Sequence, residues 1–146
     1  DLEKLHSEAI YVLELSSYQL DLAESLRCDV AVMLNISADH LSRHGGMDGY
    51  VSAKRRIFRN QGTGDFAIVG VDDVRSGVMA TQLTGEAMRQ VIPISAEYGL
   101  GRGVAVLEGM LQDSIAGRAE QPVDISGAKA LPGRHNHQNV AAAYAA

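Results

Sequence analysis

The hydrophobic pattern of the chain alternates between continuous apolar runs and segments with a helical period. Four apolar runs predict strands that are covered on both faces, and they span residues 9–15, 29–36, 65–71 and 90–94. The stretch between the first two runs is long enough for a short helical crossover, so these runs predict a βαβ unit. Proline lacks a backbone N–H group, so Pro93 predicts that the fourth strand lies at an edge of the sheet or ends there.

Helical spacing and glycine-rich turns complete the predicted fold. Residues 47–60 carry apolar side chains on one helical face, and the acidic pair after the third strand can start a second helix. Short apolar runs at 104–107 and near Ile115 lie between glycines and predict an antiparallel hairpin. A final, alanine-rich helix is expected from Arg134 onward. We therefore predict an α/β domain with a mostly parallel sheet flanked by helices and a small antiparallel annex.

The composition is that of an ordinary globular domain. Of 146 residues, 46% are hydrophobic and 21% are charged, which excludes collagen-like, low-complexity and wholly disordered chains. A net charge of -5 without a basic stripe argues against nucleic-acid binding. The longest strongly apolar stretch, Val30 to Leu34, is far shorter than a membrane helix, and the single cysteine, Cys28, cannot form an internal disulfide. We therefore expect a cytoplasmic protein without a membrane or nucleic-acid partner.

Polar side chains follow the predicted strands at their carboxyl ends, where α/β folds bind ligands. Glu14 lies near the end of the first strand, Asn35 near the end of the second, and Asp39 and His40 in the loop that follows. Glu14 is either an acid held by backbone donors or a ligand of a hard cation. Asp39 or His40 can serve a metal, a phosphate or an acid–base step, although a loop histidine is usually only solvated. We therefore expect three segments to bring polar groups to one edge of the sheet.

Lys54 is the most informative single position. It lies on the apolar face of the predicted helix, whereas the neighbouring arginines point elsewhere. Burial of an amine favours its neutral, nucleophilic form. The alternative is a lysine that extends its ammonium group to the rim, and the helix by itself favours this alternative. The apolar face is formed by Met47, Tyr50, Val51, Ile57 and Phe58.

Three further motifs give only weak evidence for a catalytic or binding site. His40 and His44 have the spacing of metal ligands, but no further zinc ligands can be nominated. Ser16 and Ser17 lack the G-x-S-x-G elbow of a nucleophilic serine. Residues 62–67 imitate a dinucleotide fingerprint but precede a strand, whereas the fingerprint follows one, so we dismiss it.

Two asparagines, Asn136 and Asn139, stand three residues apart at the start of the last predicted helix. Amide side chains can both donate to and accept from the edge of an adenine base. Asn136 can equally cap the helix, and without further context we favour capping.

Three blocks of the chain together closely resemble the central domain of the Mur ligases. These blocks are YVLELSSYQL (11–20), LNISADHLSRHGGMDGYVSAKRRIF (34–58) and LPGRHNHQNVAAAYA (131–145). Within the family, ELSSYQL is similar to the branch that adds D-glutamate, because the sister ligases carry different residues after the equivalent acid. The blocks occur in order and cover essentially the whole chain, so the resemblance is far more specific than any one block.

The resemblance implies an ATP-dependent amide ligase of peptidoglycan synthesis. ATP would phosphorylate the terminal carboxylate of UDP-N-acetylmuramoyl-L-alanine, and the amine of D-glutamate would attack the acyl phosphate. The residues that match the family's Mg2+ site are Glu14, His40 and Lys54, with Lys54 carbamylated by carbon dioxide. A carbamate forms only from an unprotonated amine, which agrees with a lysine on an apolar face. Because a nitrogen ligand is unusual for Mg2+, Mn2+ is an alternative ion.

The same match extends to the two substrates. Ser16 and Gln19 would lie near the muramoyl substrate. His135, Asn136 and Asn139 would lie near the adenine of ATP.

One feature of the family has no counterpart in this sequence. The family holds the ATP phosphates with a G-x-x-x-x-G-K-[ST] loop, and the dipeptide Gly-Lys does not occur here. In the family this loop precedes the matched blocks and follows an N-terminal UDP-binding domain, and a C-terminal domain comes after them. We therefore expect residues 1–146 to be part of a central ATPase domain that is inactive alone and can self-associate through unpaired sheet edges.

Three alternatives stay open at this point. The first is another Mur ligase or a folylpolyglutamate synthase-like ligase. The second is a non-catalytic nucleotide-binding module, which the loss of Glu14, His40 or Lys54 would favour, and none of them is lost. The third is a zinc-dependent hydrolase that uses His40 and His44.

Overall fold

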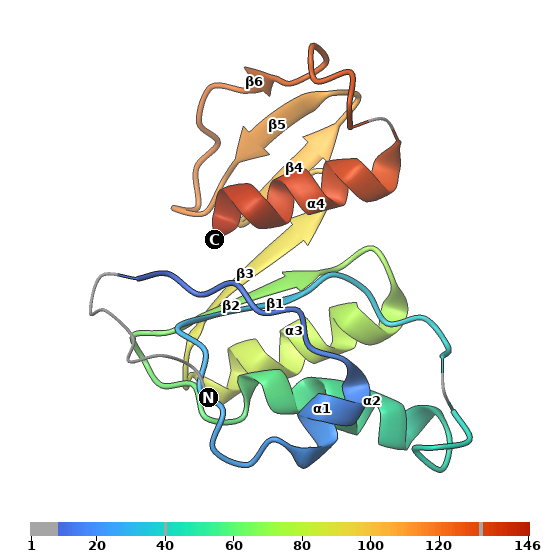
Figure 1. The fold of residues 1–146 in the computed structure, drawn as a ribbon. Helices are drawn as coiled ribbons and strands as arrows, with labels where there is room; N and C mark the ends of the chain where they lie inside the picture. Colours follow the sequence, from blue (N-terminus) through green and yellow to red (C-terminus); the bar gives the residue numbers. More distant parts are fainter. Residues whose placement is uncertain (1–8, 40, 132) are drawn as a thin grey trace.

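A computed structural model describes residues 9–39, 41–131 and 133–146 of the chain. The strands of the described part form one sheet, and their order in the sheet follows their order in the sequence (Figure 1). These strands are β1 (Val30–Met33), β2 (Phe66–Gly70), β3 (Gln90–Ser95), β4 (Val104–Leu107), β5 (Met110–Asp113) and β6 (Val123–Asp124).

The helices of the described part cover both faces of the sheet. One face carries α1, α2 and α3, and the other carries α4 (Figure 1). None of these helices is long and apolar enough to cross a lipid bilayer. The helices are α1 (Ser17–Leu22), α2 (Met47–Arg55) with a 3-10 turn η1 (Arg56–Phe58), α3 (Val74–Glu86) and α4 (Arg134–Ala145).

The sheet separates two apolar cores. On the α2 and α3 face, Phe58 and Leu83 are almost fully buried beneath β1 and β2. On the α4 face, Ala141 and Ala142 pack against side chains of the central strands, among them Ile94. Alternate side chains of a strand point to opposite faces, so strands that are apolar throughout serve both cores. The continuous apolar runs therefore predicted these strands for the right reason.

Parallel and antiparallel pairing divide the sheet as predicted. β1 to β4 pair in parallel, and β4, β5 and β6 pair antiparallel. Glu108 and Gly109 connect β4 to β5 with φ angles of 51° and 79°, the left-handed pair that matches the twist of a tight hairpin. The α/β class and the antiparallel annex are therefore confirmed.

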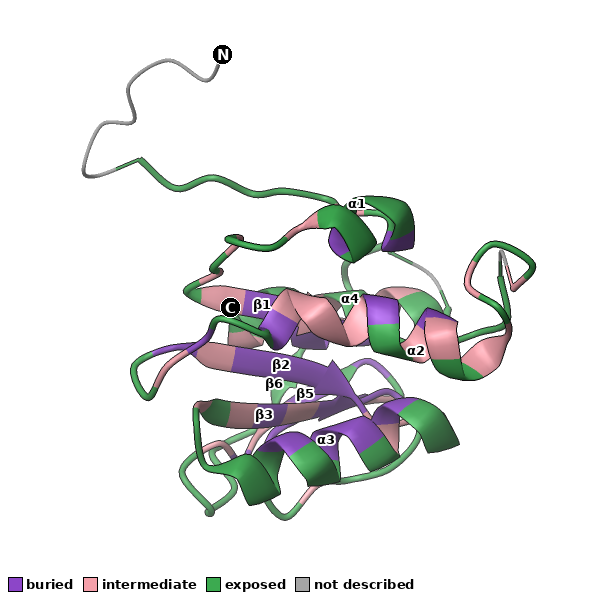
Figure 2. Cartoon of the chain, turned by 90° about the horizontal axis from the view of Figure 1, so that it is seen from below, coloured by how far each residue is buried: buried purple, intermediate pink, exposed green. Residues whose placement is uncertain are grey.

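The first predicted strand is not formed. Residues 9–16 have no regular secondary structure, and Ile10 and Val12 are 91% and 92% exposed. β1 is the outermost strand, and the segment runs beyond it without joining it (Figure 2). A strand requires the hydrogen bonds of a neighbour, which an apolar run alone does not supply. The predicted βαβ unit is therefore wrong, although its helix, α1, and its second strand, β1, are present.

Pro93 lies inside a central strand rather than at an edge, so this prediction is also wrong. β3 pairs with β2 on one side and with β4 on the other. β4 pairs only with Ile94 and Ser95, just after the proline. The Pro93 carbonyl faces Gly103, where an added Cβ would lie 2.1 Å from the Pro93 oxygen. The backbone nitrogen of Pro93 therefore faces β4 at a position before their pairing begins, so the missing N–H group removes no hydrogen bond of the sheet.

A buried carboxylate, Asp65, fixes the start of β2. It accepts hydrogen bonds from Arg27 Nε at 3.0 Å, Arg27 Nη2 at 2.8 Å and the Gly62 backbone N–H at 2.7 Å. The side chain of Asp65 is only 3% exposed. The hydrogen bonds from Arg27 and from Gly62 lower the pKa of Asp65 because they favour its ionised form.

This arrangement predicts an acid-sensitive contribution to stability. The folded state lowers the pKa of Asp65, so its contribution is complete above the unfolded pKa of about 4 and is lost as the pH falls further. We expect Asp65→Asn to reduce stability at neutral pH and to flatten the loss between about pH 5 and pH 3. Urea midpoints measured across this range test the prediction. Parallel pH profiles for the two proteins would contradict it.

Candidate active site

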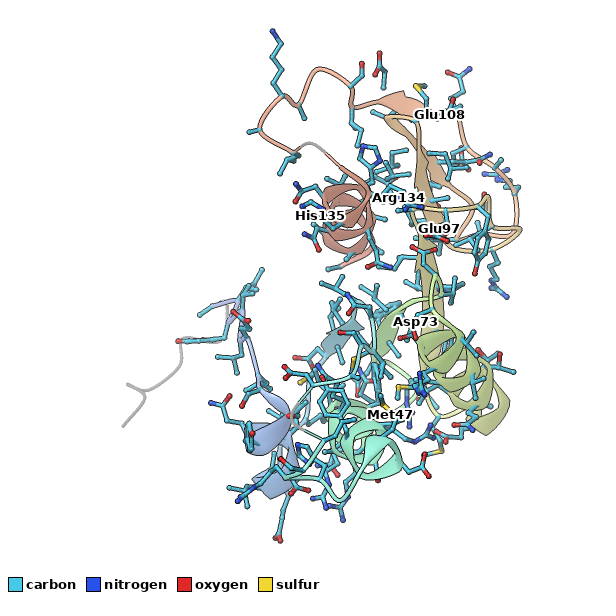
Figure 3. All side chains as sticks on the ribbon, turned by 90° about the vertical axis from the view of Figure 1, so that its right-hand side faces the viewer. Met47, Asp73, Glu97, Glu108, Arg134 and His135 are labelled. Atoms are coloured by element: carbon cyan, nitrogen blue, oxygen red, sulfur yellow. The ribbon has the colours of Figure 1, made fainter. Side chains whose placement is uncertain are left out.

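The three longer helices, α2, α3 and α4, all begin at the carboxyl edge of the parallel strands. Figure 3 looks onto this edge, where Met47 begins α2, Asp73 caps α3, and Arg134 and His135 begin α4. Arg134 Nη1 donates to Glu97 Oε1 at 3.0 Å and so ties the start of α4 to the end of β3. Backbone N–H groups at helix starts favour negatively charged ligands. These helix starts suit an anionic ligand, and the predicted gathering of polar groups from three segments at this edge stays a prediction.

Lys54 lies half-buried on α2, against the ring of Tyr50. Its Nζ atom is 5.4 Å from the ring centroid, which is a cation–π contact. Tyr50 is itself 5% exposed. Burial raises the pKa of the Tyr50 hydroxyl, and the negative charge of Asp39 raises it further. Asp39 therefore lies near enough to Tyr50 for its charge to act on the hydroxyl of the residue that Lys54 contacts.

The apolar face predicted for this helix is confirmed. Tyr50 and Phe58 belong to the buried core, and Met47, Val51 and Ile57 pack against it. The sequence left two alternatives for Lys54, a buried neutral amine or an ammonium group at the rim. The side chain is half-buried and so lies between these two alternatives. Its aliphatic stem belongs to the apolar face, and its amine lies over an aromatic ring.

Of the other two residues of the expected metal site, the structure describes only Glu14. His40 lies outside the described residues. Glu14 is exposed in the segment before α1 rather than at the end of a strand, which corrects its predicted position. α1 packs against α2, so Glu14 precedes the helix that contacts the Lys54 helix. Within the described residues, no three His, Cys, Asp or Glu side chains are grouped so that they could hold a metal ion.

His44 joins α1 to α2. Its Nε2 atom is 3.1 Å from the hydroxyl of the buried Ser17. Its ring lies 5.6 Å from the Tyr18 ring and 5.7 Å from the Tyr50 ring, measured between centroids. These contacts give His44 a structural role and provide no support for a zinc site there.

Ser16 and Gln19 form a capping box at the start of α1. The Gln19 backbone N–H donates to Ser16 Oγ at 3.3 Å, and the Ser16 backbone N–H donates to Gln19 Oε1 at 2.9 Å. Such reciprocal bonds satisfy donors that a helix start leaves open. Both side chains are exposed, and their contact with a substrate stays a prediction.

The three residues predicted to contact adenine lie in the first turns of α4. His135 and Asn139 are exposed, and Asn139 Nδ2 donates to Asn136 Oδ1 at 3.5 Å. The helix begins at Arg134, after Gly133, whose φ of 90° turns the chain. Asn136 is therefore already the third helical residue, and the prediction that it caps the helix is wrong.

Asp72 is a half-buried polar junction that the sequence analysis missed. Its carboxylate accepts from Ser95 Oγ at 2.5 Å, from the Ala96 backbone N–H at 2.9 Å and from Gln138 Nε2 at 3.0 Å. Gly70 allows this close approach, because an added Cβ would lie 2.8 Å from Gln138 Nε2. Asp72 thus joins the ends of β2 and β3 to α4, the helix of the predicted adenine contacts.

Asp73 joins a third strand to the same edge. It caps α3 through the Ser76 and Arg75 backbone N–H groups at 2.9 Å and 3.0 Å, and it accepts from the Ile36 backbone N–H at 3.1 Å. Burial opposes ionisation, but hydrogen bonds from Ser76, Ile36 and Arg75 outweigh it and lower the pKa of Asp73. The sequence did hold a signal for these two junctions, because Asp72 and Asp73 directly follow a predicted buried strand. We interpreted this pair only as the start of a helix.

A family comparison identifies the architecture. Residues 2–146 match the model of the Mur ligase middle domain. The chain belongs to the Mur ligase family. The resemblance seen in the three sequence blocks is thereby confirmed.

Curated Mur ligase relatives are similar along almost the whole chain. Proteins named UDP-N-acetylmuramoylalanine--D-glutamate ligase are 59% identical in Caulobacter vibrioides, 56% in Phenylobacterium zucineum and 49% in Rhodospirillum rubrum, each over 99% of this chain. The chain spans 31%, 31% and 30% of the lengths of these relatives.

Solved Mur ligases show the same fold. A crystal structure of MurF from Acinetobacter baumannii aligns with a TM-score of 0.54 and 25% identity, over 88% of this chain and 26% of that chain. The fold of this Mur ligase domain is thus shared with a ligase whose sequence has diverged considerably.

Proposed function

We propose that this Mur ligase domain belongs to an ATP-dependent ligase that adds D-glutamate to UDP-N-acetylmuramoyl-L-alanine in peptidoglycan synthesis. The observation that carries the proposal is the 59% identity over 99% of the chain to a relative named for that activity. Because the chain spans 31% of that relative, the proposed activity is that of a longer protein. The alternative of a non-catalytic module loses support, because Glu14, His40 and Lys54 are all present.

The proposed reaction joins a carboxylate to an amine in two steps. The γ-phosphoryl group of ATP passes to the terminal carboxylate of UDP-N-acetylmuramoyl-L-alanine, which gives an acyl phosphate and ADP. The amine of D-glutamate then attacks the acyl carbon, phosphate leaves, and the amine loses a proton. Catalysis of such a transfer depends mainly on positioning and on stabilising charge at oxygen atoms.

The donor chemistry of this chain fits a hard divalent cation. Glu14, His40 and a carbamylated Lys54 would hold Mg2+, or Mn2+, which suits the imidazole better. The charge of Asp39, the residue before His40 in the sequence, acts on Tyr50, and Lys54 lies against the Tyr50 ring, which supports this proposal. When bound, the ion supplies positive charge that stabilises the oxygens of the transferred phosphoryl group. Lys54 contributes the amine that would form the carbamate, and this amine lies 5.4 Å from the centre of the Tyr50 ring.

The nucleotide and the muramoyl substrate are assigned to opposite faces of the sheet. His135, Asn136 and Asn139 would contact the adenine, and the link from Asp72 to Gln138 holds their helix at the sheet edge. Ser16 and Gln19 would contact the muramoyl substrate from the start of α1. Their exposure supports this assignment.

The amino-acid substrate distinguishes this proposal from a sister ligase. We expect the full-length protein to release ADP from ATP and UDP-N-acetylmuramoyl-L-alanine only when D-glutamate is added, and not with L-glutamate or D-alanyl-D-alanine. The 146-residue chain alone is the control, and we expect it to release no ADP because it has no Gly-Lys phosphate loop. ADP release that follows another amino acid would assign the chain to a different branch.

We also propose a cytoplasmic location, since the substrates of this reaction are a uridine nucleotide and ATP. Self-association through the outer edge of β1 stays a prediction. Sedimentation of the 146-residue chain tests it, and the full-length protein is the control.

A further inference from the structure

Four arginines line a cavity at the edge of the sheet where the parallel strands begin, which is the edge opposite the candidate active site. The cavity has a volume of about 430 Å³ and lies between the C-terminal ends of α2 and α3. Arg55, Arg56, Arg59 and Arg89 contribute to its lining, together with Glu86. The parallel strands begin on this side, since Arg89 directly precedes β3. None of the residues assigned to the ligase reaction lines this cavity.

The charges around the cavity are not balanced. Four arginines face one glutamate in the lining, which leaves a formal surplus of three positive charges. Arg56 Nη2 also lies 3.6 Å from Asp21 Oδ1, which reduces the surplus to two. Glu86 is shared, because Arg55 donates to one of its oxygens and Arg89 Nη1 donates to the other at 3.0 Å. The cavity therefore attracts anions.

Arg89 carries an unused hydrogen-bond donor at this cavity. Its side chain is only 6% exposed, and its Nε atom is buried without an acceptor among the described residues. A buried guanidinium N–H without an acceptor is unfavourable. The negative ends of the dipoles of α2 and α3 explain why cations gather here, but they do not supply an acceptor for this N–H group. An oxygen atom of a bound ligand would supply one once the Arg89 side chain turns toward the cavity, because Nε itself has almost no accessible surface in this structure.

We propose that this cavity binds an oxyanion with at least two negative charges, either free phosphate or the phosphate group of a larger molecule. Guanidinium groups suit such ligands because their planar N–H pairs match two oxygens at once. The donors assigned to the anion are the exposed Arg59 and, once its side chain turns toward the cavity, Arg89 Nε. Phe58 and Leu83 also line the cavity, so its apolar wall can accept the organic part of a small phosphate ester. The proposal is independent of the ligase reaction.

The Nε–H resonances of the arginines report this binding directly. We titrate the full-length protein, labelled with 15N-arginine, with inorganic phosphate and compare chloride at equal ionic strength. We expect phosphate to shift the Arg89 Nε–H resonance to saturation and chloride to leave it in place. The Arg89 resonance is identified as the one that is absent from the spectrum of Arg89→Lys. Phosphate bound at the nucleotide site would shift the resonances of other residues. The shift of the Arg89 resonance therefore does not depend on whether the ligase proposal is correct.

Two variants are expected to change the affinity in opposite directions. Arg59→Gln removes one charged donor and should weaken phosphate binding about tenfold. Glu86→Gln removes a carboxylate that competes with the anion and should tighten binding about threefold. The matched control is Arg118→Gln, because Arg118 is exposed and does not line the cavity. Its affinity should equal that of the unmodified protein.

The proposal fails if phosphate leaves the Arg89 resonance unmoved, or if Arg59→Gln and Arg118→Gln bind phosphate equally well. A parallel titration with glycerol phosphate distinguishes the two sources of the anion. Tighter binding of the ester than of phosphate assigns the cavity to a phosphorylated molecule. Equal or weaker binding assigns it to free phosphate.

Discussion

Replacing Lys54 by methionine in the full-length protein is expected to lower the rate of ADP release about a thousandfold or more, a loss of about 4 kcal/mol of transition-state stabilisation. Methionine keeps an unbranched apolar stem that is one atom shorter and removes the amine that lies over the Tyr50 ring. Because Lys54 is only half-buried, the free energy of unfolding should change by less than about 0.5 kcal/mol. The loss would therefore belong to catalysis and not to folding.

Lys54→Arg separates the role of the charge from that of the carbamate. Arginine keeps the positive charge and the cation–π contact, but its guanidinium group stays protonated and forms no carbamate. We expect Lys54→Arg to be as inactive as Lys54→Met. Lys129→Met is the matched control, because Lys129 is an exposed lysine of the described chain, and it should keep full activity. An active Lys54→Arg protein would refute carbamylation, and an active Lys54→Met protein would refute any role for this amine.

Replacing Phe58 by alanine is expected to destabilise the domain by about 3–5 kcal/mol, because it removes a large side chain that is 1% exposed. Phe58 lies on η1 and contributes to the core between the sheet and the helices α2 and α3. The loss is a large fraction of the about 5–15 kcal/mol by which proteins are stable. Urea unfolding followed by circular dichroism measures it through the shift of the midpoint.

Leu22→Ala provides the control for this measurement. Leu22 is an apolar residue too, but it is 76% exposed, so its truncation should change stability by less than about 0.5 kcal/mol. Equal midpoints for Phe58→Ala and the unmodified protein would mean that the described core is not the one that stabilises the domain.

Local sequence predicted part of the candidate site and missed its connections. The apolar face of α2 was predictable, because helical spacing alone brings Tyr50, Lys54 and Phe58 to one side. The effect of the Asp39 charge on Tyr50 depends on the path of the loop before α2, which helical spacing does not express. Asp72 and Gln138 are distant in the chain, and their hydrogen bond exists only because β2 and α4 pack together. A carboxylate that joins distant segments in this way is visible only once its neighbours are assembled.

The sequence by itself determined the central strands, the hairpin, the long helices and the family. It could do so because buried parallel strands and amphipathic helices leave local patterns of period and composition. Only the tertiary structure decided that residues 9–15 form no strand, that Pro93 fits between two neighbours, and that Arg89 holds an unused donor in a cavity. Each of these depends on which groups of distant segments face one another, and hydrogen-bond partners of that kind are fixed by the fold and not by the local sequence.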